Sequence, residues 1–99
     1  MSQYILAPKV TSDLADIWQH IADDNPDAAD RVMDAFSTAF AKLAIIPGMG
    51  HLRSDLADQT LRLWPVYSYL IVYRSQTDPL EIVRVLSGYR DIAALLIGH

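Results

Sequence analysis

The stretch Leu61–Arg74, which reads LRLWPVYSYLIVYR, is the densest run of β-branched and aromatic residues in the chain. Such side chains favour the pleated, packed surface of a sheet, and polar turn residues border the run on both sides. Pro65 cannot donate a hydrogen bond to a ladder, so we expect a short strand at 61–64, a connection, and a longer strand at 69–74. After a loop of hairpin length, residues 80–86 predict a third strand. The pattern therefore indicates an antiparallel meander.

The chain before this stretch begins with one strand pattern and one helical pattern. Gln3–Leu6 is a short apolar stretch stopped by Pro8, which predicts a first strand. Thr11 or Ser12 is the expected cap of the helix that follows. The apolar side of this helix is formed at helical spacing by Val10, Leu14, Ile17, Trp18 and Ile21. The spacing predicts an amphipathic helix that packs its apolar side on the sheet.

A second helix is predicted from Pro26 to about Ile45. Asn25 offers an N-cap, and Pro26 suits the first helical position. Because almost no loop separates the two helices, they must form an antiparallel hairpin. Laid on an antiparallel sheet made of the first strand and the meander, this hairpin gives a two-layer α+β fold in one domain, residues 1–99.

The C-terminal segment adds one more expected element. Asp91 begins an apolar tail at 92–97 that predicts a short helix. The hairpin covers only one face of the sheet, so we expect the other face, or the hairpin surface, to be available to a partner.

The composition limits the class of protein. With 99 residues, 52% of them hydrophobic and 20% charged, the chain is long enough for one packed domain and is not a disordered sequence. It has no apolar run of membrane-spanning length and no signal-peptide pattern, so we expect a cytoplasmic protein without membrane contact. The absence of cysteine excludes disulfides and fits a reducing compartment.

The net charge of −4 is unevenly distributed along the chain. Residues 1–47 contain seven Asp against three basic residues, whereas residues 48–99 contain five Arg against five acidic residues. A protein that follows phosphates normally carries a clear positive excess. Direct nucleic-acid binding is therefore not expected.

Four arginines on or just after the predicted strands are the first binding candidates: Arg62, Arg74, Arg84 and Arg90. A solvated sheet face would explain them without a function, whereas convergence into a positive patch would suit a target or an acidic partner. Arg84 alternates with Ile82 and Leu86 in an apolar strand. It therefore needs a partner, either a carboxylate or the backbone near residues 89–91.

Three aromatic residues complete the candidate set. Trp18 and Trp64 sit in apolar patterns that favour the core, but either would be a candidate interface anchor if exposed. Tyr89 lies beside Arg90. The three histidines are far apart in sequence, and capping explains the acidic residues near the predicted helix junction, so we expect no metal site and no cofactor.

The order of these segments resembles the ParE toxins of the RelE/ParE superfamily. The matching segments are the first strand, the hairpin DLADIWQHIADDNPDAADR, the link LAIIPGMGHLRSDL, the strand pair LRLWPVYSYLIVYR and the ending IVRVLSGYRD. Together they cover residues 4–96. The resemblance implies a type II toxin that a ParD-like antitoxin neutralises by direct binding, in a hetero-oligomer. It also implies one of two actions, since the ParE branch poisons DNA gyrase and the RelE branch cuts messenger RNA on the ribosome.

The residues favour the ParE branch. Cleavage of RNA through the 2′-hydroxyl needs a base, cations and an acid, which the RelE branch supplies with lysines, a sheet arginine and a tail tyrosine. At the matching positions this chain has Leu61 and Leu63, Leu70, and Leu96. Only Arg90 persists, and Ser87 stands where many relatives carry a histidine. We therefore expect no catalytic residues.

Three interpretations remain open at this point. The first is a toxin that binds and inhibits DNA gyrase, and the second is a ribosome-dependent ribonuclease. The third is a domain that has lost toxicity and only binds an antitoxin. The shared fold cannot decide among them.

Overall fold

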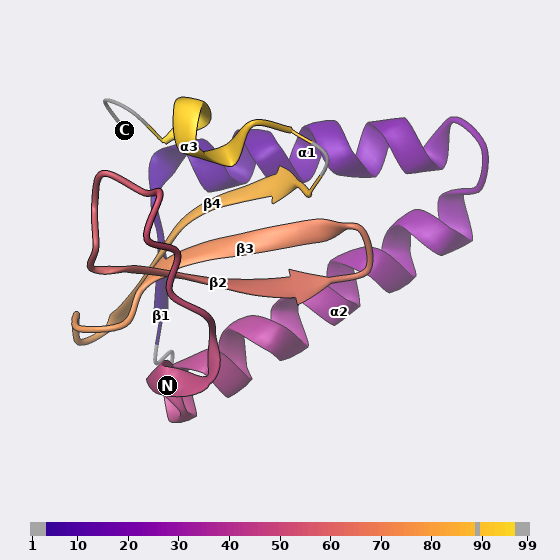
Figure 1. Cartoon of the computed structure of the whole chain (residues 1–99). Coiled ribbons are helices and arrows are strands. Elements are labelled where there is room, and N and C mark those ends of the chain that lie inside the picture. Colours follow the sequence, from indigo (N-terminus) through magenta and orange to yellow (C-terminus); the bar gives the residue numbers. More distant parts are fainter. Residues whose placement is uncertain (1–3, 89, 97–99) are drawn as a thin grey trace.

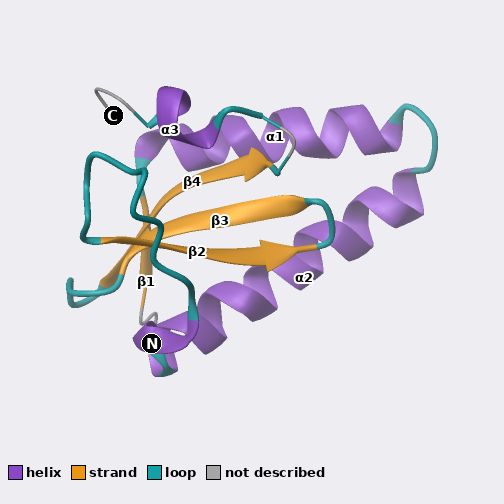
Figure 2. Cartoon of the chain, viewed as in Figure 1, coloured by secondary structure: helices purple, strands orange, loops and turns teal. Residues whose placement is uncertain are grey.

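The computed structural model describes residues 4–88 and 90–96 (Figure 1). Its elements are β1 (Tyr4–Leu6), α1 (Pro8–Ala22), α2 (Pro26–Ile45), the 3-10 turn η1 (Pro47–Met49), β2 (Leu61–Val66), β3 (Tyr69–Arg74), β4 (Leu80–Ser87) and α3 (Ile92–Leu95). Helices α1 and α2 form a hairpin beside the sheet (Figure 2). The predicted α+β class is confirmed.

The sheet of the described residues has the strand order β1-β4-β3-β2. Strands β2, β3 and β4 form the predicted antiparallel meander. Strand β1, however, pairs parallel to β4, with Tyr4 opposite Leu80 and Leu6 opposite Ile82, so the expectation of an antiparallel first strand was wrong. The apolar residues of β1 favour a strand, but its direction depends on a partner at the far end of the chain.

The expected break at Pro65 was also wrong. Strand β2 continues through Pro65 to Val66, and only Tyr67 and Ser68 connect it to β3. Leu63, two positions earlier, exchanges backbone hydrogen bonds of 2.8 Å with His51 on the outer side of β2. Pro65 therefore faces the same outer side, where its missing N–H interrupts no bond to β3.

The start of α1 differs from the prediction, whereas α2 follows it. Helix α1 begins at Pro8, which occupies the first helical position, so Thr11 and Ser12 lie inside the helix. A proline there is favourable because its φ is already helical and its missing N–H has no partner in the first turn. Helix α2 has the expected cap, since the Asn25 side chain accepts a hydrogen bond from the backbone N–H of Ala28.

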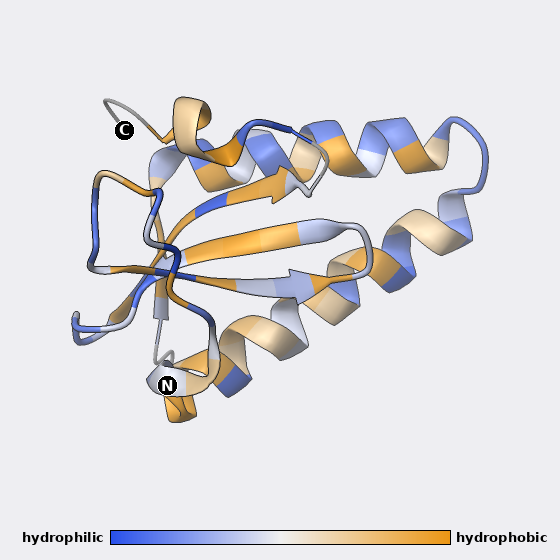
Figure 3. Ribbon diagram, viewed as in Figure 1, coloured by the Kyte–Doolittle hydropathy of each residue, from blue (hydrophilic) through white to orange (hydrophobic). Residues whose placement is uncertain are grey.

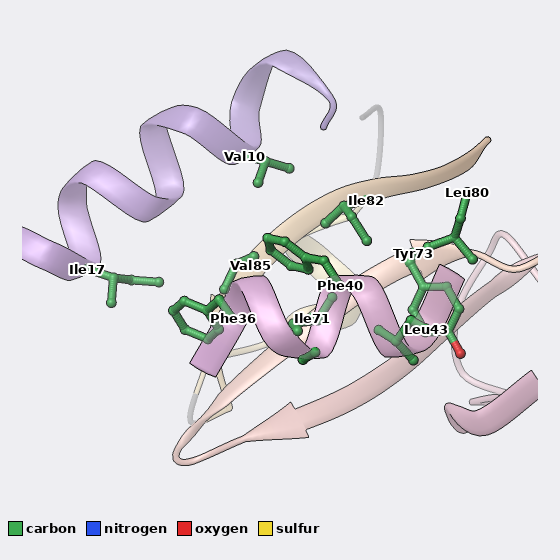
Figure 4. Packing of buried hydrophobic residues seen from close by; sticks show 11 residues of the cluster. Val10, Ile17, Phe36, Phe40, Leu43, Ile71, Tyr73, Leu80, Ile82 and Val85 are labelled. Atoms are coloured by element: carbon green, nitrogen blue, oxygen red, sulfur yellow. The ribbon is translucent and has the colours of Figure 1, made fainter. Parts of the chain in front are cut away.

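The main core lies between the hairpin and the sheet. Both helices alternate apolar and polar residues at helical spacing (Figure 3). The apolar side chains meet those of the central strands in one buried cluster (Figure 4) that includes Val10, Ile17, Phe36, Phe40, Leu43, Ile71, Tyr73, Leu80, Ile82 and Val85.

A second core covers much of the opposite face of the sheet. Its members are Leu56, Leu61, Leu63, Val72, Val83, Leu86, Ile92 and Leu96. The loop before β2 and the short helix α3 supply the covering side chains, and the Asp91 carboxylate caps α3 by accepting from the N–H of Ala94. The predicted short helix is confirmed. The expectation of a bare second face was wrong for the part that this cluster covers.

Candidate functional site

Arg84 reaches out of the sheet to helix α1. Its Nε and Nη2 atoms donate to the two carboxylate oxygens of Asp13, each at 2.8 Å. The same carboxylate accepts from the backbone N–H of Val85 at 3.0 Å. Both side chains are nearly buried, and the bond to Asp13 raises the pKa of Arg84 above its usual value. Of the two expected kinds of partner, the structure shows the carboxylate, and it is Asp13 of α1.

Arg74 is held by two acidic residues on the side of the sheet away from the hairpin. Its Nη1 lies 2.6 Å from Asp58, and its Nε lies 3.1 Å from Glu81. Thr60 donates to Asp58 through its hydroxyl and its backbone N–H. These Thr60 bonds and Arg74 lower the pKa of Asp58 to about 2. The cluster joins the loop before β2 to strands β3 and β4.

Arg62 belongs to a hydrogen-bond network at the end of the main core, which we call the polar lock. Its Nη1 donates to the carbonyl of Gly50 at 2.9 Å, and its Nε donates to the Ser75 hydroxyl at 3.3 Å. The buried Tyr73 hydroxyl accepts from the Gly50 N–H at 2.8 Å and donates to the Pro47 carbonyl at 2.7 Å. This network fixes the loop that follows α2.

Arg90 differs from these three arginines. Its side chain is exposed and makes no hydrogen bond or ion pair with any other described residue. It lines a groove between α1 and the end of β4, together with Asp13, Asp16, His20, Tyr69 and Ser87. Among the four candidate arginines, it is the one whose charge is available to a partner.

The structure therefore separates the arginines instead of gathering them into one patch. Arg74 and Arg84 line a common hollow beside Lys9, but carboxylates offset both of their charges. Arg62 lies among the residues at the end of the main core, and Arg90 lies in the α1–β4 groove.

The aromatic candidates have different surroundings. Trp18 is 37% exposed on the hairpin, and its indole N–H donates to Asp30 at 2.9 Å, so the expectation that it belongs to the core was wrong. The indole N–H is paired with a carboxylate of α2 at the surface, so the ring stays at the edge of the hairpin. Trp64 is half-buried against the main core and stacks on His51. Tyr89 lies outside the described residues.

The sequence reasoning missed Tyr67. This residue has a φ of 54° and is 71% exposed in the two-residue turn between β2 and β3. The signal was present in the spacing, because continuing β2 through Pro65 leaves only Tyr67 and Ser68 for the turn. The assumed break at Pro65 concealed it.

The described part of the chain has neither a membrane-spanning helix nor a metal-binding cluster. None of its helices combines the length and the apolar character needed to cross a membrane. In residues 4–88 and 90–96, no three His, Asp or Glu side chains gather in a way that could hold a metal ion.

A helical hairpin packed on a small mixed sheet is the fold expected from the resemblance to the RelE/ParE superfamily of toxins. The sequence model of the family described as the ParE toxin of type II toxin-antitoxin system, parDE, matches residues 4–92. The chain therefore belongs to this family. It is 28% identical over 97 residues to Toxin ParE3 of Caulobacter vibrioides, covering 97% of this chain and 96% of that relative.

A solved structure supports the fold. A chain of the chromosomal ParDE TA system from P. aeruginosa matches with a TM-score of 0.70 at 16% sequence identity. The match covers 85% of this chain and 92% of that one. At this identity the likeness concerns the fold alone.

Proposed function

We propose that this ParE-family toxin acts by binding DNA gyrase, without catalysis of its own, and that a ParD-like antitoxin neutralises it by direct binding. The proposal implies a cytoplasmic protein, because gyrase acts on the chromosome, and a hetero-oligomer whenever antitoxin is present.

The second core carries the argument against ribonuclease chemistry. Leu61, Leu63 and Leu96 stand where the RelE branch has its lysines and its tail tyrosine, and all three are buried members of that core. Leu70, at the position of the sheet arginine, packs against the same cluster. Stabilising a phosphorane needs cations that reach substrate, whereas these side chains exclude water and offer neither charge nor a proton. This apolar packing favours action by binding.

The arginines support the same proposal. A cation that stabilises a transition state must be free to meet the developing negative charge. Arg62, Arg74 and Arg84 instead hold the fold together through the Gly50 carbonyl and three carboxylates. Arg90 alone of the four keeps an exposed guanidinium, and one cation is too little for the chemistry described.

The test is a supercoiling assay with purified gyrase and the free, folded protein, read together with accumulation of cleaved DNA. Inhibition that the ParD-like antitoxin reverses is the expected result. Full gyrase activity at micromolar toxin, with transcript cleavage in cells that express the protein, would transfer the proposal to the ribosome. Full gyrase activity without growth arrest would leave an antitoxin-binding domain that is not toxic.

A further inference from the structure

The backbone at Tyr67 adopts a conformation that favours glycine. Its φ of 54° lies in the left-handed region, where the Cβ of an L-residue crowds the following carbonyl. Turn positions of this kind are usually occupied by Gly, Asn or Asp, and a bulky aromatic residue there is uncommon. Tyrosine at position 67 therefore makes the fold less stable than glycine at the same position would.

Little burial and no polar partner among the described residues offset this cost. The Tyr67 side chain is 71% exposed and takes part in no hydrogen bond or ring contact found among residues 4–88 and 90–96. Strained backbone that the fold itself does not use is typical of functional positions. Among residues 4–88 and 90–96, no hydrogen bond or ring contact gives a reason for an aromatic side chain here.

The turn presents Tyr67 on a firm support. The N–H of Gly88, at the end of β4, donates to the carbonyl of Ser68 at 2.8 Å and ties the turn to the sheet. Tyr67 borders a hollow on each side. One hollow is shared with His20, Asp24 and Asn25 of the hairpin, and the other with Pro65, Leu70 and Gly88. The turn and the loop between α1 and α2 lie toward the same end of the molecule (Figure 1).

We propose that Tyr67 is the anchor of the surface through which this toxin contacts its protein target. The surface consists of Tyr67, Ser68, His20, Asp24 and Gly88, and is called the turn surface below. Interfaces between folded proteins commonly combine a polar rim with a few aromatic anchors, and truncating such an anchor weakens binding strongly. The inference rests on the proposed function, since it names the side of the toxin that meets gyrase.

Charge indicates the chemistry of the matching surface on the target. Asp24 lines one of the hollows beside Tyr67, and the exposed Asp23 and Asp27 stand next to it at the junction of α1 and α2. The complementary partner surface is cationic and contains a pocket that takes a tyrosine ring.

The distribution of exposed apolar side chains favours the target over the antitoxin as occupant. Within residues 4–88 and 90–96, the large exposed hydrophobic residues other than Trp18 and Tyr67 lie on β1, at the end of α2 and in the loop after it: Ile5, Leu6, Ile45, Ile46 and Leu52. A disordered segment that folds on binding must bury much apolar surface to offset its ordering. The turn surface is mostly polar, which suits a partner that is already folded.

The experiment compares Tyr67→Gly and Tyr67→Phe with the wild type. The glycine variant relieves the strained φ and removes the ring, so its melting temperature should equal or exceed that of the wild type. Its half-inhibitory concentration for gyrase supercoiling should rise at least about tenfold, the usual range for a lost aromatic anchor. The phenylalanine variant keeps the ring and should stay within about threefold of the wild type, because the hydroxyl has no described partner.

Affinity for the ParD-like antitoxin and growth arrest are measured in parallel. Tyr67→Gly should keep its antitoxin affinity and lose growth arrest. Ile45→Ser changes an exposed apolar residue at the end of α2 and is the control, so it should keep both gyrase inhibition and growth arrest. Undiminished inhibition by Tyr67→Gly, or an equal loss of antitoxin affinity, would overturn the inference. If the wild type spares gyrase but arrests growth, the proposed target fails while Tyr67→Gly still tests the surface: continued arrest by this variant overturns the inference, and relief supports it. A wild type that arrests no growth overturns both.

Discussion

The Asp13 carboxylate accepts a hydrogen bond from the backbone N–H of Val85, on the edge of β4 just beyond the last residue of β1. The last pair of the parallel ladder joins Leu6 to Ile82, and the N–H of Ala7 donates to the Ile82 carbonyl. Beyond it, Asp13 accepts from the Val85 N–H and from the Arg84 guanidinium. One side chain thus satisfies a backbone donor and neutralises a nearly buried cation, and it fixes α1 against the sheet.

Asp13→Asn should destabilise the protein by about 2–3 kcal/mol, because it removes the charge that compensates a nearly buried guanidinium. Urea unfolding followed by circular dichroism measures this loss. Asp16→Asn, one turn along the same helix, is the matched control and should change stability by less than about 0.5 kcal/mol, since Asp16 is exposed. Equal effects of the two substitutions would show that the bridge contributes little.

The cluster around Asp58 predicts a pH dependence. The pKa of Asp58 is about 2 in the folded protein, against about 3.9 for an unperturbed Asp. Because folding lowers this pKa, the stabilisation is complete above pH ~4 and is lost as the pH falls toward 2. Since the side chain is 28% exposed and solvent screens its charge, we expect only about 1 kcal/mol at neutral pH.

Asp58→Asn should therefore be less stable than the wild type at pH 7 and should converge with it near pH 2. Unfolding curves between pH 2 and 7 measure the difference. A constant difference across this range would mean that hydrogen bonding, and not the charge, supplies the effect.

Tyr73→Phe should lower stability by about 1–3 kcal/mol. The substitution keeps the ring but leaves the Gly50 N–H and the Pro47 carbonyl without their shared partner in a buried place. Tyr69→Phe is the control, because Tyr69 contacts Phe36 edge to face while its hydroxyl has no hydrogen bond within the described residues. Denaturant midpoints for the two variants measure the contribution of the lock, and similar midpoints would contradict it.

Leu63→Lys restores a lysine at a position where the RelE branch has one. We expect a loss of roughly 4 kcal/mol and no transcript cleavage, because the ammonium would have to enter the second core. The control is Leu52→Lys, in the loop before β2, where the side chain is 57% exposed and the substitution should be nearly neutral. A stable, RNA-cleaving Leu63→Lys variant would contradict the structural account of this face.

Local patterns in the sequence predicted the helical hairpin, the meander and the short last helix, because each depends on neighbouring residues and their spacing. Asn25 and Asp91 cap helices where the sequence placed caps. Apart from the start of α1, which lies at Pro8, the failures concern contacts between distant segments. Nothing in the local sequence pairs Asp13 with Arg84, and the position of Pro65 made sense only once β2 was known to be an edge strand.

The candidate site was predicted less completely for the same reason. The sequence identified the arginines but could not show that three of them are engaged within the fold and one is not. Tyr67 escaped notice because its distinguishing property is a backbone angle. Exposure, pairing and strain depend on the assembled molecule, which composition and periodicity do not describe.

The parallel pairing of β1 with β4 determines when this toxin can finish folding. Strand β1 can pair only after β4 has been synthesised. The second core is complete only when Ile92 and Leu96 are present. Contacts so distant in sequence form late, and a ribosome adds only about 5–20 residues per second. Residues up to at least Leu96 must therefore be translated before both cores can close. A product that ends before β4 would lack the partner strand of β1 and part of both cores, so synthesis interrupted there should yield a harmless fragment and not a weakened toxin.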